Sequence, residues 1–135
     1  MSKQTGLGWT TATVDDASGT PQAIKNDFND LKISTPMAVI DVTGIDKFAF
    51  ERLLGLADAS ITWDGTFNPA ANMSHAVFSS VPNTRVNRTT TNVVGGATFA
   101  FEALYTDYAL TRATGGAFTF QAPGVLADGT APTWS

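Results

Sequence analysis

The chain has 135 residues, a net charge of −4, one histidine and no cysteine. This length suits a single domain, and a hydrophobic fraction of 43% supplies enough apolar material for a core, which excludes a wholly disordered chain. Without cysteine there is no disulfide framework and no Cys-based metal or redox site. The basic residues are scattered, so the footprint of a protein that grips nucleic acid is missing. No apolar run approaches the ~20 residues that span a bilayer, and Met1–Gly6 lacks the apolar core of a secretory signal, so we expect a protein made in a cytoplasm.

The first part of the chain contains a polar loop and a broken helical pattern. Residues 15–21 are polar and rich in turn formers, so we expect them to lie outside the core and to be mobile in a monomer. Ile24, Phe28 and Leu31 have helical spacing, but Asn and Asp residues between them are poor helix formers. The sequence therefore predicts a turn that leads into a strand from about Asp30.

The next segment combines a helical pattern with the clearest strand of the chain. The sequence predicts a helix that Asp46 caps and Gly55 ends. Its apolar face would consist of Phe50, Leu53 and Leu54. Residues 60–68 then alternate between apolar and polar side chains, with Trp63 on the apolar face. This period of two is typical of a strand with one buried and one wet face.

A short helix and an unusually polar strand follow. Ser74 can cap a helical turn that stops at Pro82. Residues 85–94 have strong β propensity but almost no apolar face. Such a strand is either an exposed edge strand or a strand that meets a neighbouring subunit. The candidate inter-subunit residues are Arg85, Asn87, Arg88 and Thr90.

The last third of the chain predicts an antiparallel hairpin. In residues 98–106 the side chains of Phe99, Phe101 and Tyr105 point the same way, and residues 108–112 continue this strand or start another. A turn at 115–116 leads into a second alternating strand over residues 117–122.

No group of side chains in the sequence points to catalysis or metal binding. We interpret His75 as a surface histidine near a helix start, because its neighbours offer no metal-ligand spacing. The glutamates, Glu51 and Glu102, have no evident partner for acid–base chemistry. Asp15 and Asp16 fit a turn, because the residues that follow lack the alternating oxygen ligands of a calcium loop. We therefore predict a non-enzymatic protein without a cofactor or a metal.

Several segments form a pattern through their order and spacing. They are Asp41–Lys47, which begins Asp-Val-Thr-Gly, the strand Leu56–Phe67, and the closing stretches Tyr108–Arg112 and Gly124–Trp134. Together they resemble the tail tube proteins, or major tail proteins, of long-tailed bacteriophages. The resemblance runs over most of residues 35–134.

This resemblance implies a mainly β fold, a small β-sandwich or barrel with one or two short flanking helices. Inner strands of the subunits would join into a continuous barrel in a hexameric ring, and rings would stack into the tube of a virion tail. The implied partners are further copies of the chain, a tape-measure protein, and tail tip or baseplate proteins. DNA would pass through without specific binding, no membrane would be involved, and assembly would take place in the cytoplasm of a bacterial host.

The resemblance also suggests sites within a single tail-tube domain over residues 1–135, with a flexible loop near 15–21 and an extended C-terminal arm near 124–135. The candidate assembly loop comprises Asp15, Asp16, Ser18, Gly19 and Pro21. The candidate acidic residues facing the lumen are Asp64, Glu102 and Asp107.

Two alternatives remain open. One is a monomeric β-sandwich module that binds carbohydrate, for which Trp9, Trp63 and Trp134 could offer stacking platforms. The other is the tube subunit of a contractile injection device.

Overall fold

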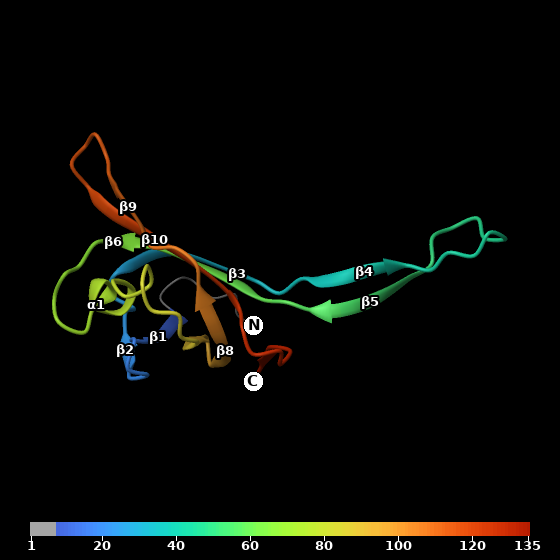
Figure 1. Cartoon of the computed structure of the whole chain (residues 1–135), viewed down its shortest axis with the longest axis horizontal. Coiled ribbons are helices and arrows are strands. Elements are labelled where there is room, and N and C mark those ends of the chain that lie inside the picture. Colours follow the sequence, from blue (N-terminus) through green and yellow to red (C-terminus); the bar gives the residue numbers. More distant parts are fainter. Residues whose placement is uncertain (1–7) are drawn as a thin grey trace.

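The computed structural model describes residues 8–135, so the N-terminal stretch Met1–Gly6 considered above lies outside the described residues. The protein is mainly β, with 52% of residues in strands and 5% in helix, which confirms the predicted fold class. Figure 1 divides it into a body and a long hairpin that projects from the body. We call the hairpin, residues 36–57, the arm; it contains β4 (Met37–Asp41) and β5 (Arg52–Ala57).

One antiparallel sheet of nine strands forms the body. The strands along its main path are, in spatial order, β2 (Pro21–Ala23), β1 (Trp9–Asp15), β7 (Arg88–Val94), β8 (Ala97–Tyr105), β10 (Phe118–Leu126), β6 (Ser60–Thr66) and β3 (Phe28–Ser34). Off this path, β9 (Ala109–Arg112) pairs with β10, and β11 (Thr133–Trp134) pairs with β8. The sheet curls so that β1, next to one end of this order, meets β3 at the other end: the rings of Trp9 in β1 and Phe28 in β3 lie 5.8 Å apart. The curled sheet encloses the core.

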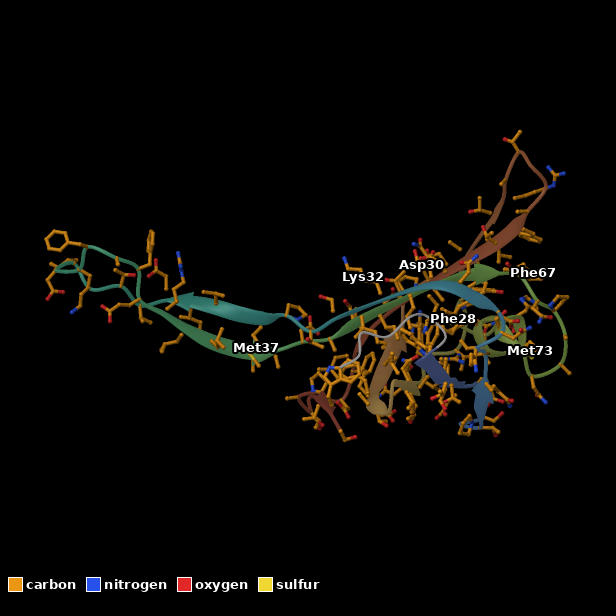
Figure 2. The ribbon with its side chains drawn as sticks, turned by 180° about the vertical axis from the view of Figure 1, so that it is seen from behind. Phe28, Asp30, Lys32, Met37, Phe67 and Met73 are labelled. Atoms are coloured by element: carbon orange, nitrogen blue, oxygen red, sulfur yellow. The ribbon has the colours of Figure 1, made fainter. Side chains whose placement is uncertain are left out.

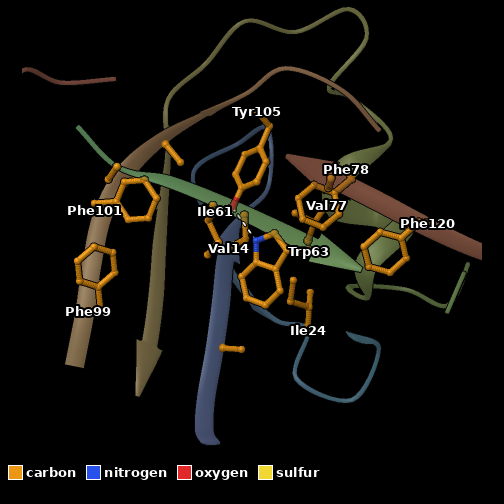
Figure 3. Packing of buried hydrophobic residues seen from close by; sticks show 14 residues of the cluster. Val14, Ile24, Ile61, Trp63, Val77, Phe78, Phe99, Phe101, Tyr105 and Phe120 are labelled. Carbon is orange, nitrogen blue, oxygen red and sulfur yellow. Dashed lines mark hydrogen bonds between the residues drawn. The ribbon is translucent and has the colours of Figure 1, made fainter. Parts of the chain in front are cut away.

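The core combines apolar side chains with a short polar chain at its centre (Figure 3). Trp63 is fully buried and donates its Nε1–H to the Tyr105 hydroxyl over 2.9 Å. That hydroxyl lies 2.8 Å from Oγ1 of Thr90, which is also buried. Because a buried polar group costs free energy unless it is hydrogen-bonded, these hydrogen bonds fix the relative positions of β6, β7 and β8.

The strands predicted from period-two alternation are confirmed. Residues 60–66 form β6, and residues 97–105 form β8 with alternate side chains buried. The predicted hairpin is β9–β10, closed by a turn in which the Ala113 N–H donates to the Ala117 carbonyl. The turn before β3 is also present, and β3 begins at Phe28, close to the predicted Asp30.

The helix predicted after Asp46 is wrong. Residues 52–57 are strand β5 of the arm, and the segment before them is the tip of the arm. The side chains that would have formed the buried helical face remain exposed: Phe50, Leu53 and Leu54. An amphipathic helix is stable only where its apolar face packs on a core. Here the segment pairs with β4 as a strand instead.

The second predicted helix is confirmed as α1 (Ser74–Phe78), but its cap differs from the prediction. Met73 occupies the N-cap position, and the Ser74 hydroxyl has no hydrogen-bond partner among the described residues. The distant Asp27 carboxylate accepts from the backbone N–H of Ser74 and from the Asn68 amide, both over 2.8 Å. A carboxylate at this end satisfies free N–H groups, so tertiary structure supplies the cap that local sequence does not.

The interpretation of residues 85–94 as an exposed edge strand is wrong. Strand β7 pairs with β1 on one side and with β8 on the other. Its inward side chains are polar and almost fully buried: Arg88, Thr90 and Asn92.

The predicted extended C-terminal arm is also replaced by a different arrangement. Residues 124–126 belong to β10, and the chain then folds back so that β11 pairs with β8. The ring of Trp134 lies 4.8 Å from that of Phe99. The extended element of this protein is therefore the β4–β5 arm, not the C-terminal segment.

Candidate assembly interface

The arm continues two strands of the body outward. β3 leads into β4 and β5 leads into β6, so a two-stranded ribbon runs from the body into the arm (Figures 1 and 2). At the junction the Asp58 N–H donates to the Pro36 carbonyl over 2.9 Å. Within the arm Val39 pairs with Leu54 and Ile40 with Leu53, after a bulge near the base. The ribbon is thus joined to the body at its base only, and its pairing there is irregular.

The tip of the arm is held by its own hydrogen bonds. Asp41 accepts from the Thr43 backbone N–H over 3.0 Å and from the Thr43 hydroxyl over 2.6 Å. These bonds lower the pKa of the Asp41 carboxyl. The same hydroxyl accepts from the Glu51 N–H over 2.9 Å, and the Lys47 N–H closes a turn onto the Gly44 carbonyl. The Asp-Val-Thr-Gly element therefore turns the chain and joins the two sides of the tip.

The arm carries most of the exposed apolar side chains of the described chain. Of fifteen large exposed hydrophobic residues, ten lie between positions 37 and 56. At the tip Ile45 and Phe48 have relative exposures of 108% and 107%. Figure 2 shows side chains projecting from the arm into open space, and labels Met37 near its base. Such a concentration of exposed apolar side chains on one element is typical of an interaction surface.

The free energy of burying apolar side chains also favours a covered arm. An isolated two-stranded hairpin is marginal in water, because neither of its faces is covered. Burying one large apolar side chain contributes roughly 1.5–3 kcal/mol, so covering Ile45, Phe48 and Phe50 would stabilise a contact by several kcal/mol. Within the described residues, no surface covers these side chains of the arm.

The candidate assembly loop is a tight hairpin turn between β1 and β2. The Asp16 carboxylate accepts from the backbone N–H groups of Ser18 and Thr20 and from the Gln22 amide. The bond from Thr20 is the main cause that lowers the pKa of Asp16. Gly19 has a φ of +84°, a conformation that favours glycine. Residues 15–21 thus form a compact turn on the body, and the role of this loop in assembly stays a prediction.

The candidate lumen-facing acids lie in different surroundings. Asp64 sits on β6, where its cross-strand neighbours are Asp30 on β3 and Gln121 on β10. Glu102 lies on β8 and accepts a hydrogen bond from the Thr89 hydroxyl of β7. Asp107 is exposed just after β8. Asp64 and Glu102 therefore lie on two strands, β6 and β8, that β10 separates in the sheet.

The candidate inter-subunit residues divide into two pairs. Arg85 and Asn87 are exposed, whereas Arg88 and Thr90 are buried in the body, which corrects their assignment to a surface. The Arg88 guanidinium donates to three groups of the body: the Val77 carbonyl over 2.8 Å, the Asp15 carbonyl over 3.1 Å and the Ser80 hydroxyl over 2.7 Å. Burial lowers the pKa of Arg88. Arg88 thus ties α1 and the segment after it to the end of β1.

The arm was not predicted from the sequence, although a signal for it was present. Apolar, β-branched residues precede the turn-forming Asp41–Asp46 stretch, and apolar residues follow it. Two apolar runs separated by Asp and Gly are a hairpin signal. Helical spacing over residues 50–54 competes with that signal, and only pairing with β4 resolves the ambiguity.

The remaining candidate sites do not combine into a ligand site. Trp63 is buried, Trp9 packs on Phe28, and Trp134 packs on Phe99, so the tryptophans do not share a platform. Within residues 8–135, no group of three or more His, Cys, Asp and Glu side chains could hold a metal ion. In the same residues, no helix is long and apolar enough to span a membrane.

Comparisons with known proteins find similarity at the level of structure. No protein-family model and no curated protein sequence matches the chain. The fold is similar to a chain in the tail of an empty gene transfer agent particle, solved with helical refinement and sixfold symmetry, with a TM-score of 0.74 and 18% identity. It is also similar to a chain in the virion of a native gene transfer agent particle, with a TM-score of 0.70 and 15% identity. Both matches cover 98% of this chain and 99% of the other, so the arm and body together form a fold found in such particles.

Proposed function

We propose that this protein is a structural subunit of a phage-like tail tube, which assembles with further copies of itself through the β4–β5 arm. The observation that carries the proposal is the concentration of large exposed apolar residues on the arm. The likeness to chains of gene transfer agent particles supports it, because one of those structures is a tail with sixfold and helical symmetry. The proposed location is the virion tail, and the further partners are a tape-measure protein and tail tip or baseplate proteins.

The asymmetry of the contact favours an extended assembly. The arm and the body present different surfaces, so an arm that docks on the body of another copy makes a heterologous contact. Contacts of this type close into rings when the rotation permits, and otherwise continue as helical filaments. A stack of rings combines the two, because contacts close within each ring and repeat along the tube.

Open strand edges supply the second contact. In the described residues, β3 has one partner strand, β6, and β9 has one partner strand, β10. The other edges of β3 and β9 can pair with neighbouring subunits, which removes the liability of exposed edges. The layer β3–β6–β10–β9 then contributes four strands to the wall of a continuous barrel.

The dimensions of such a barrel suit a DNA duplex. Six copies of this layer give ~24 strands, spaced ~4.8 Å and tilted by ~45°. The backbone radius is then roughly 26 Å and the bore about 40 Å. A duplex of about 20 Å passes through with water around it.

The face of this layer that points away from the core is polar and carries little positive charge. It includes Asp30, Lys32, Asp64 and Gln121, which follow from the register of β3, β6 and β10. A basic wall would bind the DNA backbone at every ring, whereas this face lets DNA slide. In this arrangement Asp64 faces the lumen and Glu102, on β8 outside this layer, does not.

Electron microscopy of the purified protein tests the proposal. We expect hollow tubes with a regular axial repeat after concentration, or after addition of a tail tip complex that nucleates them. The variant Ile45→Asp/Phe48→Asp should remain a folded monomer and form no tubes, because charge replaces the apolar tip. Ala71→Asp is the matched control, since Ala71 is exposed on the body. Tubes of normal yield from the tip variant would contradict the proposal.

The loop between β1 and β2 is proposed as an additional assembly contact. Deleting Ser18 to Pro21 should leave a folded monomer that polymerises poorly. Normal tubes from this deletion would show that the loop is not essential.

A further inference from the structure

We propose that the arm tip of one copy seats in a hollow beside the end of β8 in another copy, with Asp46 of the tip facing Arg85 at the hollow. This inference rests on the proposed function and goes further by naming the receiving surface.

The hollow lies between the segment that follows α1 and the end of β8. It has a volume of about 340 Å³. Its lining residues are Val81, Pro82, Thr84, Arg85, Leu104, Tyr105 and Thr106. Leu104 is 36% exposed, and its cross-strand partner Val125 is 39% exposed, so an apolar patch extends from the hollow across β10. The size is at the small end of the range for ligand pockets, about 300–1,000 Å³, which suits one or two side chains.

The tip offers side chains that match this hollow. Ile45 and Phe48 are fully exposed, and Asp46 lies between them in the sequence. Phe50 is already engaged, because the Arg52 guanidinium lies 4.5 Å from the centre of its ring. Ile45 and Phe48 are therefore the anchors, and an aromatic anchor in a pocket is typical of the energetic centre of an interface.

Charge complementarity fixes the pairing. Arg85 is exposed at the hollow, whereas Arg88 nearby is buried and donates to groups of its own body. Asp46 and Lys47 are neighbouring exposed charges at the tip, and of these two only Asp46 is opposite in sign to Arg85. Opposite charges beside an apolar contact set its register and disfavour wrong partners.

The occupant must be another copy of the chain. The arm points away from its own body in Figure 1, and ten residues of extended strand span about 30 Å. The body has a radius of gyration of about 13 Å, so the arm reaches nearly a full body diameter outward. The tip cannot return to the hollow of its own chain while β4 and β5 continue β3 and β6.

Other hollows fit the tip less well. The one between β6, β9 and β10 is lined largely by polar residues, including Asn29, Asp64 and Gln121. Another lies at the base of the arm itself, between Pro36 and Asp58. Neither joins an exposed apolar patch of the body to an exposed arginine.

Engineered disulfides give a direct test, because the chain has no native cysteine. The variant Phe48→Cys/Leu104→Cys is assembled into tubes and then mildly oxidised. We expect a ladder of covalent multimers on a non-reducing gel, because a disulfide requires Cα atoms about 4.4–6.8 Å apart. The control Phe48→Cys/Ala71→Cys, with the second cysteine elsewhere on the body, should give no ladder. Tubes that form without a ladder from the Leu104 pair, or with one from the control pair, would overturn this inference and leave the proposed function intact; absence of tubes in the unmodified chain would count against the proposed function itself.

Charge reversal provides a second test that does not depend on cysteine geometry. Arg85→Glu should raise the concentration needed for polymerisation roughly five- to tenfold, because it places like charges together. Asp46→Arg in the same chain should restore assembly. Circular dichroism of each monomer checks the fold. A variant that assembles normally with Arg85→Glu alone, or a pair that shows no rescue, would contradict the proposed contact.

Discussion

The body and the arm are both built from antiparallel strands, but they differ in which side chains they bury. In the body, nine strands curl around a core in which even polar side chains are buried and hydrogen-bonded. In the arm, two strands expose apolar residues on a ribbon that no part of the described chain covers. The body therefore covers its own core, whereas the arm, under the proposed function, is covered by another copy of the chain. Substitutions should separate the two regions: changes in the body act on stability, and changes in the arm act on assembly.

The largest effect on stability is expected at Trp63. Its side chain is fully buried at the centre of the core, and its Nε1–H satisfies the Tyr105 hydroxyl. Trp63→Ala should lower the free energy of unfolding by about 3–5 kcal/mol, because it removes apolar contacts and leaves a cavity. Urea denaturation of the monomer measures the change. A loss below about 1 kcal/mol would mean that the core is not packed around this residue.

Arg88 should have the next largest effect. Arg88→Leu leaves the Val77 and Asp15 carbonyls and the Ser80 hydroxyl without their donor, and we expect a loss of about 2–4 kcal/mol. Arg85→Leu is the matched control: this arginine is exposed, so its replacement should change monomer stability by less than about 0.5 kcal/mol. Equal effects from the two variants would contradict the distinction between a buried and an exposed arginine.

Alkaline pH should weaken the body through Tyr105. Burial raises the pKa of its hydroxyl from 10.0 to about 12. Because the folded-state pKa is higher than the unfolded value, the stabilisation is complete below pH 10 and is lost as the pH rises through 12. The loss attributable to Tyr105 is up to ~2.7 kcal/mol, because the pKa difference of about two is worth ~1.36 kcal/mol per pKa unit.

Denaturation of Tyr105→Phe at several pH values checks this expectation. The variant should be less stable at neutral pH, because Trp63 and Thr90 lose a partner, and should lose less stability between pH 10 and 12. Tyr108, whose pKa is also raised to about 12 by burial, is only partly buried and accounts for a smaller residual loss. An unchanged alkaline profile in the variant would exclude Tyr105 as the source.

The smallest effect on monomer stability is expected at the arm tip. Ile45→Asp/Phe48→Asp should change the free energy of unfolding by less than about 0.5 kcal/mol, because both side chains are fully exposed. Assembly, followed by light scattering, should nevertheless be lost. A clear drop in monomer stability would show that the tip packs on its own body in solution and would remove the contrast between arm and body.

Local sequence determined the strands whose surroundings match their own pattern. Alternation over residues 60–68 and 98–106 predicted the strands that the structure has as β6 and β8, because one face of each strand meets the core and the other meets solvent. The turn before β3 and the β9–β10 hairpin followed from residues that disfavour helix or favour turns.

Only the tertiary structure decided the role of β7 and of the arm. β7 is polar by sequence yet central in the sheet, because hydrogen-bond partners from distant segments satisfy Arg88 and Thr90. The arm is apolar by sequence yet exposed, because β4 and β5 pair with each other and with nothing else among residues 8–135. A sequence states which side chains avoid water, but the partner that shields them, in this chain or in another, is set by long-range contacts that no local pattern contains.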